Sequence, residues 1–132
     1  MIKLRYQNYL LFCSLDLNIN SQNLNLKNVL IDTGSATTLI NADYILLDGN
    51  EKIKNAQGIG GYERILVKKF ESLRLNDITL KNVSLSIGDM DYGIDIDLLI
   101  GLDMLKILNA NINIKNMTLE LNGCNVINDF SK

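Results

Sequence analysis

The feature that most constrains this chain is an apolar stretch that runs directly into an acidic residue. Residues 29–31 are Val, Leu and Ile, and Asp32, Thr33 and Gly34 follow them. A short run of branched apolar residues is typical of a buried strand, and a glycine allows the tight turn that ends it. A carboxylate at the end of a buried strand is costly unless it is stabilised or used. Asp32 is therefore the leading candidate for a functional residue.

The composition predicts one globular domain that spans residues 1–132. Of the 132 residues, 47% are hydrophobic and 21% are charged, which suits a single core. The net charge is −2 and the basic residues are scattered, which argues against a nucleic-acid partner. No apolar run approaches the roughly 20 residues that cross a bilayer, and residues 10–13 are too short for a secretory signal. We therefore expect a cytoplasmic protein without membrane contact, with Cys13 and Cys124 as free, buried thiols.

The chain contains no histidine, which limits its possible chemistry. Ser-His-Asp and Cys-His catalysis and histidine-ligated zinc are excluded. Residues 89–97 carry alternating acids, as calcium loops do, but Ile94 and Ile100 stand where such a loop needs Gly and Glu. Any hydrolysis would therefore rest on carboxylates, hydroxyls, Lys or a metal held by oxygen ligands. Because the acidic segment fits a solvated loop better than a calcium site, we expect no metal and no cofactor.

Alternating apolar residues predict a mostly β fold with one or two short helices. Strands are expected at residues 9–19, 24–31, 62–70, 72–75, 78–87, 97–100, 110–114 and 117–121. Residues 51–70 are expected as a hairpin with a glycine-rich tip at residues 57–62, where glycines permit positive φ.

Short helices, loops and a tail complete this interpretation. Residues 41–47 are expected to form a helical turn with Asn41 as its N-cap, and residues 102–108 a short helix. Residues 88–97 are expected as a polar loop, and residues 122–132 as a polar tail that either docks or frays.

Three features, in chain order, resemble the retropepsin-like aspartic proteases over about residues 24–121. They are the strand that leads into Asp-Thr-Gly, the glycine-rich residues 58–62, and the sequence Leu-Ile-Gly-Leu-Asp-Met-Leu at residues 99–105. The second is similar to the flap tip of retroviral proteases. The third more closely resembles the cellular branch, which includes the DNA-damage-inducible retropepsin-like proteins and single-domain bacterial members. The resemblance implies the closed β-barrel of the acid protease fold.

This resemblance implies an aspartic endopeptidase whose active site is shared by two chains. Two carboxylates that hold one water can hydrolyse a peptide bond without a metal or a covalent nucleophile. The chain has a single Asp-Thr-Gly, so the second carboxylate must come from a second copy across a two-fold axis. The implied catalytic residues are Asp32, Thr33 and Gly34. The implied substrate-binding residues are Ser35, Ala36, Gly58, Ile59, Gly60 and Gly61, and the partners are a second copy and a peptide or protein substrate.

The resemblance also implies roles for single residues around Asp32. Thr33 would send its hydroxyl across the axis, and the Gly34 backbone would donate toward the carboxylates. The Ser35 hydroxyl would hydrogen-bond Asp32 from outside. Gly101 would let its strand pack behind the Asp32 loop.

The chain departs from the retroviral pattern at two positions that pair in those enzymes. Ala36 and Thr37 stand where retroviral enzymes have acids, and Leu102 stands where they have Arg. Two alternatives stay open on the same fold. The first is a non-catalytic β-rich dimer that serves as a peptide-binding or interaction module, and the second is a monomer that needs a different partner chain.

Overall fold

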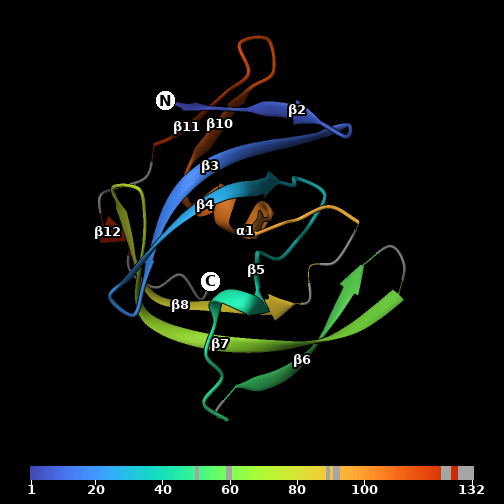
Figure 1. Ribbon diagram of the computed structural model, residues 1–132, viewed down its shortest axis with the longest axis vertical. Helices are drawn as coiled ribbons and strands as arrows, with labels where there is room; N and C mark the ends of the chain where they lie inside the picture. Colours follow the sequence, from blue (N-terminus) through green and yellow to red (C-terminus); the bar gives the residue numbers. More distant parts are fainter. Residues whose placement is uncertain (50, 59–60, 89, 91–92, 123–125, 128–132) are drawn as a thin grey trace.

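Strands dominate the fold, and two short helical segments interrupt them (Figure 1). The computed structural model describes residues 1–49, 51–58, 61–88, 90, 93–122 and 126–127, and the side chains of residues 54–58, 61–64 and 126–127 lie outside that description. In chain order the elements are β1 (Ile2–Lys3), β2 (Arg5–Gln7), β3 (Leu10–Ile19), β4 (Gln22–Ile31), β5 (Leu39–Asn41), the 3-10 helix η1 (Ala42–Tyr44), β6 (Lys52–Gly58), β7 (Gly61–Leu75), β8 (Ile78–Gly88), β9 (Leu98–Ile100), α1 (Leu102–Ile107), β10 (Ala110–Asn113), β11 (Thr118–Leu121) and β12 (Val126–Ile127).

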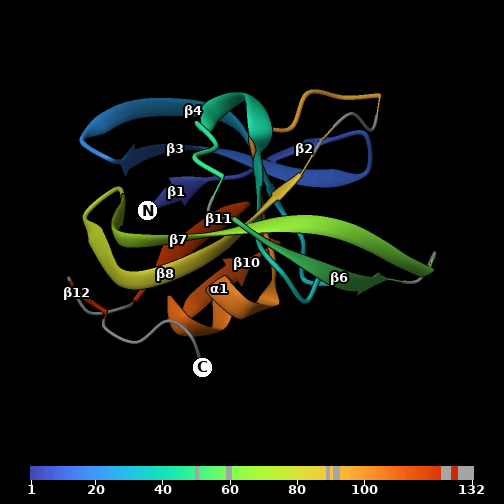
Figure 2. The ribbon, with the colours of Figure 1, turned by 90° about the horizontal axis from the view of Figure 1, so that it is seen from below.

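Six of the strands form a closed ring of hydrogen-bonded neighbours. The order around the ring is β8, β5, β9, β4, β3 and β7, and β7 pairs again with β8. β6 pairs with β7 in a long hairpin that projects from the ring (Figure 2). The expected mostly β, closed-barrel fold of the retropepsin type is confirmed.

The core of the ring follows from the alternation seen in the sequence. In β3 one face is buried, and the intervening Ser14 and Asp16 are exposed. The buried side chains on that face are Cys13, Leu15, Leu17 and Ile19. Burying a leucine or isoleucine side chain contributes about 1.5–3 kcal/mol, so this face gives the strand a strong preference for one register.

The turns of the barrel rely on asparagine. Asn20 and Ser21 both have positive φ, at 52° and 64°, and form a two-residue turn between β3 and β4. Asn76, between β7 and β8, and Asn109, between α1 and β10, also have positive φ, which asparagine tolerates better than most residues. Asn82 has positive φ within β8. Because the first turn is so tight, β4 begins at Gln22 and not at the expected residue 24.

A three-stranded sheet, in the order β1, β11 and β10, lies beside the ring. The hairpin of β10 and β11 is the closing hairpin expected from the sequence, and the backbone N–H of the buried Leu4 donates to Met117 O at 2.8 Å. β1 and β2 were not expected, because strands of two or three residues are too short to show alternation.

The expected strands at residues 62–70 and 72–75 are one continuous strand, β7. Its pairing with β8 passes from Phe70–Val83 to Ser72–Lys81 without a turn between them. The prediction of two strands was wrong because the polar Glu71 is simply an exposed position of one strand.

The acidic segment at residues 88–97 is only partly the polar loop that was expected. Met90 and Ile96 are each only 2% exposed and belong to an apolar cluster. From the expected tail, Val126–Ile127 docks as β12 in parallel with β8. Among the described residues, no helix is long and apolar enough to cross a bilayer.

Candidate active site

Asp32 directly follows β4, which is one of the strands of the ring. β3 flanks β4 on one side and β9 on the other. The Asp32 backbone N–H donates to Ile100 O at 3.0 Å, so the residue is anchored to the end of β9. Asp32 is half-buried, whereas Thr33 and Gly34 are exposed. The carboxylate therefore lies directly after a buried strand, at an end of the barrel, as the sequence predicts.

The Asp32 carboxylate is oriented by its own loop. The Gly34 backbone N–H donates to Asp32 Oδ1 at 3.0 Å, and the Ser35 N–H donates to Asp32 O at 3.2 Å. A Cβ on residue 34 would lie 3.3 Å from Asp32 Oδ1, so glycine keeps this approach free. Hydrogen bonds to a charged carboxylate are stronger than neutral ones, and this one fixes the carboxylate beside the turn.

The Ser35 side chain does not do what the resemblance implies. Its hydroxyl donates to Thr37 O at 2.9 Å and does not bond Asp32, so it braces the loop internally. Ala36 is exposed beside it. Gly58 and Gly61 pair at the end of the β6–β7 hairpin, while Ile59 and Gly60 lie outside the described residues.

Gly101 is where the Asp32 loop meets the strand behind it. A Cβ at this position would lie 2.6 Å from Thr37 O and 2.8 Å from Ser35 O, both backbone atoms. Because a real Cβ does not approach other atoms closer than 3.0 Å, any side chain at residue 101 would force the backbone around it to move. The Leu102 N–H donates to Ser35 O at 2.7 Å on the same side. The expected close packing at Gly101 is confirmed.

Thr38 and Asp103 link the same two segments. Asp103 belongs to the motif at residues 99–105, but its pairing with Thr38 was not expected from the sequence. The Thr38 hydroxyl donates to Asp103 Oδ1 at 2.7 Å and accepts from the Gly101 N–H at 3.0 Å. The Thr38 N–H donates to Asp103 Oδ2 at 3.2 Å. Thr38 is 1% exposed, so these bonds are shielded from water. This pair fastens the loop to α1 although Leu102 replaces the arginine of retroviral enzymes.

Asp97 holds the middle of β4 and was also missed. Its Oδ2 accepts from the backbone N–H of Lys27 and Asn28, at 3.2 and 3.0 Å, and its Oδ1 accepts from the Tyr44 hydroxyl at 2.7 Å. Burial, together with this hydrogen bond, raises the pKa of Tyr44 to about 12. The N-cap predicted at Asn41 is confirmed, since its side chain accepts from Asp43 N, and η1 is thereby placed beside Asp97.

A small apolar cluster lies on the face of the sheet that carries Asp32. Because side chains alternate along a strand, Leu30 and Asp32 point to the same face of β4. Leu30 pairs with Phe12 of β3 and with Leu99 of β9. The cluster is completed by Met90 and Ile96, with Leu39 and Ile94 partly buried against it. It forms an apolar floor beside the carboxylate.

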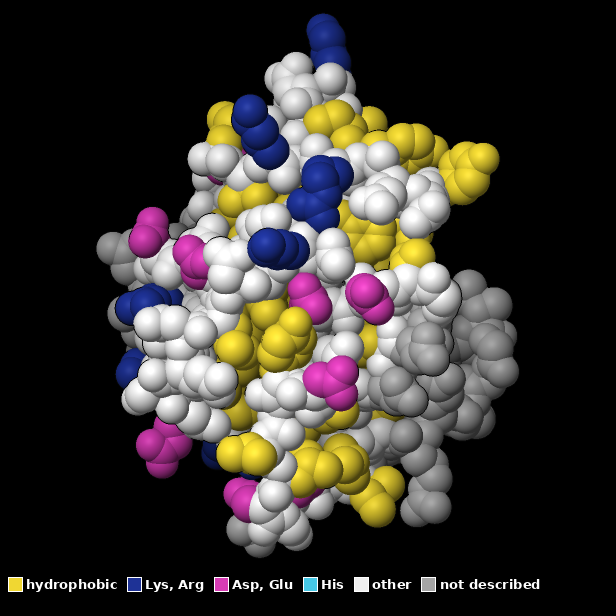
Figure 3. Space-filling model, viewed as in Figure 1, with side chains coloured by type: hydrophobic (Ala, Val, Ile, Leu, Met, Phe, Trp, Pro, Cys, Tyr) yellow, Lys and Arg dark blue, Asp and Glu magenta, His cyan; other side chains and the backbone are white. Residues whose placement is uncertain are grey.

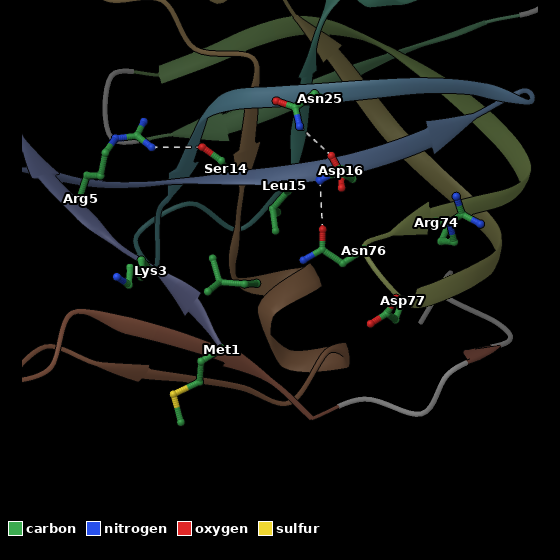
Figure 4. A pocket seen from close by; sticks show the side chains of 11 residues that line it. Met1, Lys3, Arg5, Ser14, Leu15, Asp16, Asn25, Arg74, Asn76 and Asp77 are labelled. Carbon is green, nitrogen blue, oxygen red and sulfur yellow. Dashed lines mark hydrogen bonds between the residues drawn. The ribbon is translucent and has the colours of Figure 1, made fainter.

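A cavity of about 1110 Å³ lies elsewhere, between β1, β3 and the turn from β7 to β8 (Figure 4). Its lining is mostly polar, and several of its side chains bond one another. Asn25 donates to Asp16 Oδ1 at 2.8 Å, the Asp16 N–H donates to Asn76 Oδ1 at 3.0 Å, and Arg5 donates to Ser14 Oγ at 3.3 Å (Figure 4). Asp32 is not among the residues that line it.

Comparison with protein families agrees with this geometry. Residues 15–107 match the family described as gag-polyprotein putative aspartyl protease. The chain belongs to this family. The match begins within β3 and ends with α1, so it includes Asp32, Thr38, Gly101 and Asp103. At family level the chain is a retropepsin-like aspartic protease. A search of curated proteins found no match.

Proposed function

We propose that this protein is a homodimeric aspartic endopeptidase in which each subunit contributes one Asp32. The proposal rests on the position and orientation of the Asp32 carboxylate. It stands half-buried at the end of a buried strand, is oriented by the Gly34 N–H at 3.0 Å, and is flanked by the exposed Thr33. A second carboxylate can approach this edge from a symmetric partner, and a two-fold axis beside Asp32 brings two identical loops together.

The reaction then follows from two carboxylates that share one proton. The ionised carboxylate takes a proton from water, and the water oxygen attacks the carbonyl carbon of the scissile peptide bond. The protonated carboxylate donates to the carbonyl oxygen, so a gem-diol forms without a free oxyanion. As the diol collapses, the C–N bond breaks and the carboxyl that took a proton from water donates it to the leaving amine. The other carboxylate takes the proton of one diol hydroxyl, so the pair again shares one proton. Two carboxylates in contact titrate as a coupled pair, so neither copy has a fixed role.

The proposed substrate is an extended peptide that lies between the Asp32 loops and the β6–β7 hairpins. Figure 1 shows the loop after β4 on the same side of the molecule as the end of β6 and the start of β7. In this proposal residues 58–61 act as a flap over the peptide. The apolar floor beside Asp32, with the partly buried Leu39 and Ile94, supports a preference for apolar side chains next to the cleaved bond.

The test compares wild type with Asp32→Asn on a denatured-protein or peptide-library substrate, across about pH 4 to 7. We expect cleavage by wild type and its loss in the variant, with dimerisation kept. Asp77→Asn is the matched control, because Asp77 is an exposed carboxylate at the turn between β7 and β8. A wild type that is dimeric but inert would instead support a non-catalytic peptide-binding module. A wild type that stays monomeric in sedimentation would point to a different partner chain.

A further inference from the structure

The cavity of about 1110 Å³ between β1, β3 and the β7–β8 turn carries charges of both signs in a definite order. We call it the β3 groove. Arg5 and Arg74 lie toward its two ends and Asp16 lies between them (Figure 4), and Lys3 and Asp77 complete its charged lining. In Figure 3 Lys and Arg side chains gather over the upper part of the molecule, where Figure 1 places β2 and the β10–β11 hairpin, although the chain has a net charge of −2. This lining suits a charged ligand better than an apolar one.

The Arg5 guanidinium is fixed in place by neutral oxygens. It donates to Lys27 O at 2.7 Å, to Asn28 Oδ1 at 3.2 Å and to Ser14 Oγ at 3.3 Å. A guanidinium has five N–H donors, so these bonds orient the group and leave donors for an outside acceptor. Among the described residues, neither Arg5 nor Arg74 forms an ion pair. Both positive charges are therefore available to carboxylates of a ligand.

The floor of the β3 groove is a stretch of β3 that lies between two neighbouring strands. β2 pairs with residues 10–12 of β3, and β7 pairs with residues 17–19. Between them, the Asp16 N–H donates to Asn76 Oδ1 at 3.0 Å and the Asn76 N–H donates to Asp16 O at 2.9 Å. The backbone of Ser14 faces the same edge as that of Asp16, because edges alternate along a strand. No strand of the described chain pairs with Ser14 there, so an extended chain can lie along this edge.

The charges are spaced like alternate residues of a strand. The Arg5 guanidinium contacts Ser14, and Arg74 pairs in register with Asn18. Ser14, Asp16 and Asn18 share one face of β3, and a rise of about 3.3 Å per residue places the first and last about 13 Å apart. The order positive, negative, positive therefore advances in steps of two residues. Side chains on one face of an extended peptide have the same spacing.

We infer that the β3 groove binds an extended polypeptide segment with acidic side chains at positions i and i+4 and a basic side chain at i+2. The two acids contact Arg5 and Arg74, and the basic side chain contacts Asp16. One oxygen of Asp16 is available for this contact, because within the described chain its carboxylate accepts only from Asn25, at Oδ1 and 2.8 Å. Asp32 does not line the groove, so this binding goes beyond the proposed cleavage and does not depend on it.

The order of charges favours a polypeptide over other anions. A nucleic-acid strand carries a negative charge about every 3.4 Å, so it would place phosphates against Asp16 and Asp77. A small anion reaches only one of two arginines that lie beside positions about 13 Å apart. A polypeptide can instead place opposite charges at alternate positions.

The first test compares two labelled nine-residue peptides by fluorescence anisotropy. One has glutamates at its third and seventh positions, a lysine at its fifth and serines elsewhere, and the other has the same composition in scrambled order. Asp32→Asn is used beside wild type so that cleavage does not interfere. We expect the patterned peptide to bind at least about fivefold more tightly, with less advantage at high salt, because partly exposed charge pairs are screened. Equal affinities would overturn the inference.

The second test removes one cation with Arg74→Met, which keeps a long side chain. We expect affinity for the patterned peptide to fall about 3- to 10-fold, because a carboxylate loses its guanidinium partner. Lys115→Met is the matched control, because it removes the same charge from the exposed β10–β11 turn, which does not line the groove. The control should stay within about twofold of wild type. An equal loss in both variants would indicate general attraction and contradict a groove.

The third test reverses the middle charge with Asp16→Lys, at an exposed position where the fold tolerates the change. This variant should bind a peptide with a third glutamate in place of the central lysine more tightly than the patterned peptide. An unchanged preference for the lysine would refute the contact at Asp16. Displacement of the patterned peptide by an equal concentration of inorganic phosphate, or tighter binding of a single-stranded oligonucleotide, would also overturn the inference.

The outcome can be separated from that of the proposed function. Patterned binding by a wild type that cleaves nothing would support the β3 groove and reject the protease proposal. Cleavage by a wild type that does not distinguish the two peptides in the binding assay would reject the groove alone.

Discussion

Replacing Thr38 by valine tests the link between the Asp32 loop and α1. Valine has nearly the same shape as threonine, so the substitution removes the hydroxyl and leaves the packing. The lost hydroxyl donates to Asp103 Oδ1 at 2.7 Å and accepts from the Gly101 N–H at 3.0 Å, at a site that is 1% exposed.

The expected cost follows from these two bonds. A hydrogen bond to a charged group contributes about 1.5–3 kcal/mol and a neutral one about 0.5–1.5 kcal/mol. The extra buried methyl group of valine returns up to about 0.8 kcal/mol. Asp103 keeps two backbone donors, from Thr38 and Met104, which limits the penalty on its carboxylate. We therefore expect the free energy of unfolding to fall by about 2–3 kcal/mol.

The measurement is urea unfolding at a fixed protein concentration, with peptide cleavage assayed beside it. Thr79→Val is the control, because Thr79 is a partly exposed threonine on β8, and it should change stability by less than about 0.5 kcal/mol. Combined with Asp103→Asn, the Thr38 effect should be less than additive. Cleavage should fall at least about tenfold, because the Asp32 loop loses its anchor. A loss no larger than that of Thr79→Val would refute the reasoning.

Further predictions concern three other sites. Gly101→Ala should destabilise the fold by about 3 kcal/mol, because its Cβ would lie 2.6 Å from the backbone oxygen of Thr37; a wild-type urea midpoint would contradict this. Burial raises the pKa of the Cys13 thiol from 9.0 to about 12, so unfolding releases its proton between those values. Stability should therefore be intact below about pH 9 and fall toward pH 12, more steeply in wild type than in Cys13→Ala, as urea midpoints at each pH would show. Lys68→Met should cost about 2–3 kcal/mol in the same assay, because Lys68 lies 3.5 Å from the carboxylate of Glu51, whose side chain is 5% exposed; a loss below 0.5 kcal/mol would argue against the pair.

Much of the fold could be predicted because its signals are local. The alternation in residues 10–19 predicts β3, and the apolar run before Asp32 predicts the end of β4. Asn41 caps η1 as expected, because a cap depends on residues two or three positions away. The same holds for the β10–β11 hairpin. Where one strand continues through polar residues, as β7 does, the local pattern gave a false boundary.

Other parts of the candidate site depend on contacts between residues far apart in the chain. Thr38 and Asp103 are 65 residues apart, and neither belongs to a pattern that indicates the other. Met90 lies in an acidic segment but is buried, because the cluster around Leu30 and Leu99 covers it. The Ser35 hydroxyl bonds Thr37 because the loop turns back on itself, which its position after Gly34 did not indicate.

The sequence alone determined the chemistry that is available. Without histidine, the chain has no Ser-His-Asp or Cys-His catalysis, and its single Asp-Thr-Gly makes Asp32 the leading candidate for a hydrolytic carboxylate, which we propose to act with a second copy of itself. The tertiary structure decided how Asp32 is held and what surrounds it. Strand pairing brings Ile100, Gly101 and Thr38 behind its loop. Composition and motif are properties of neighbouring residues, whereas the support of a site is a property of strands that meet only when the barrel closes.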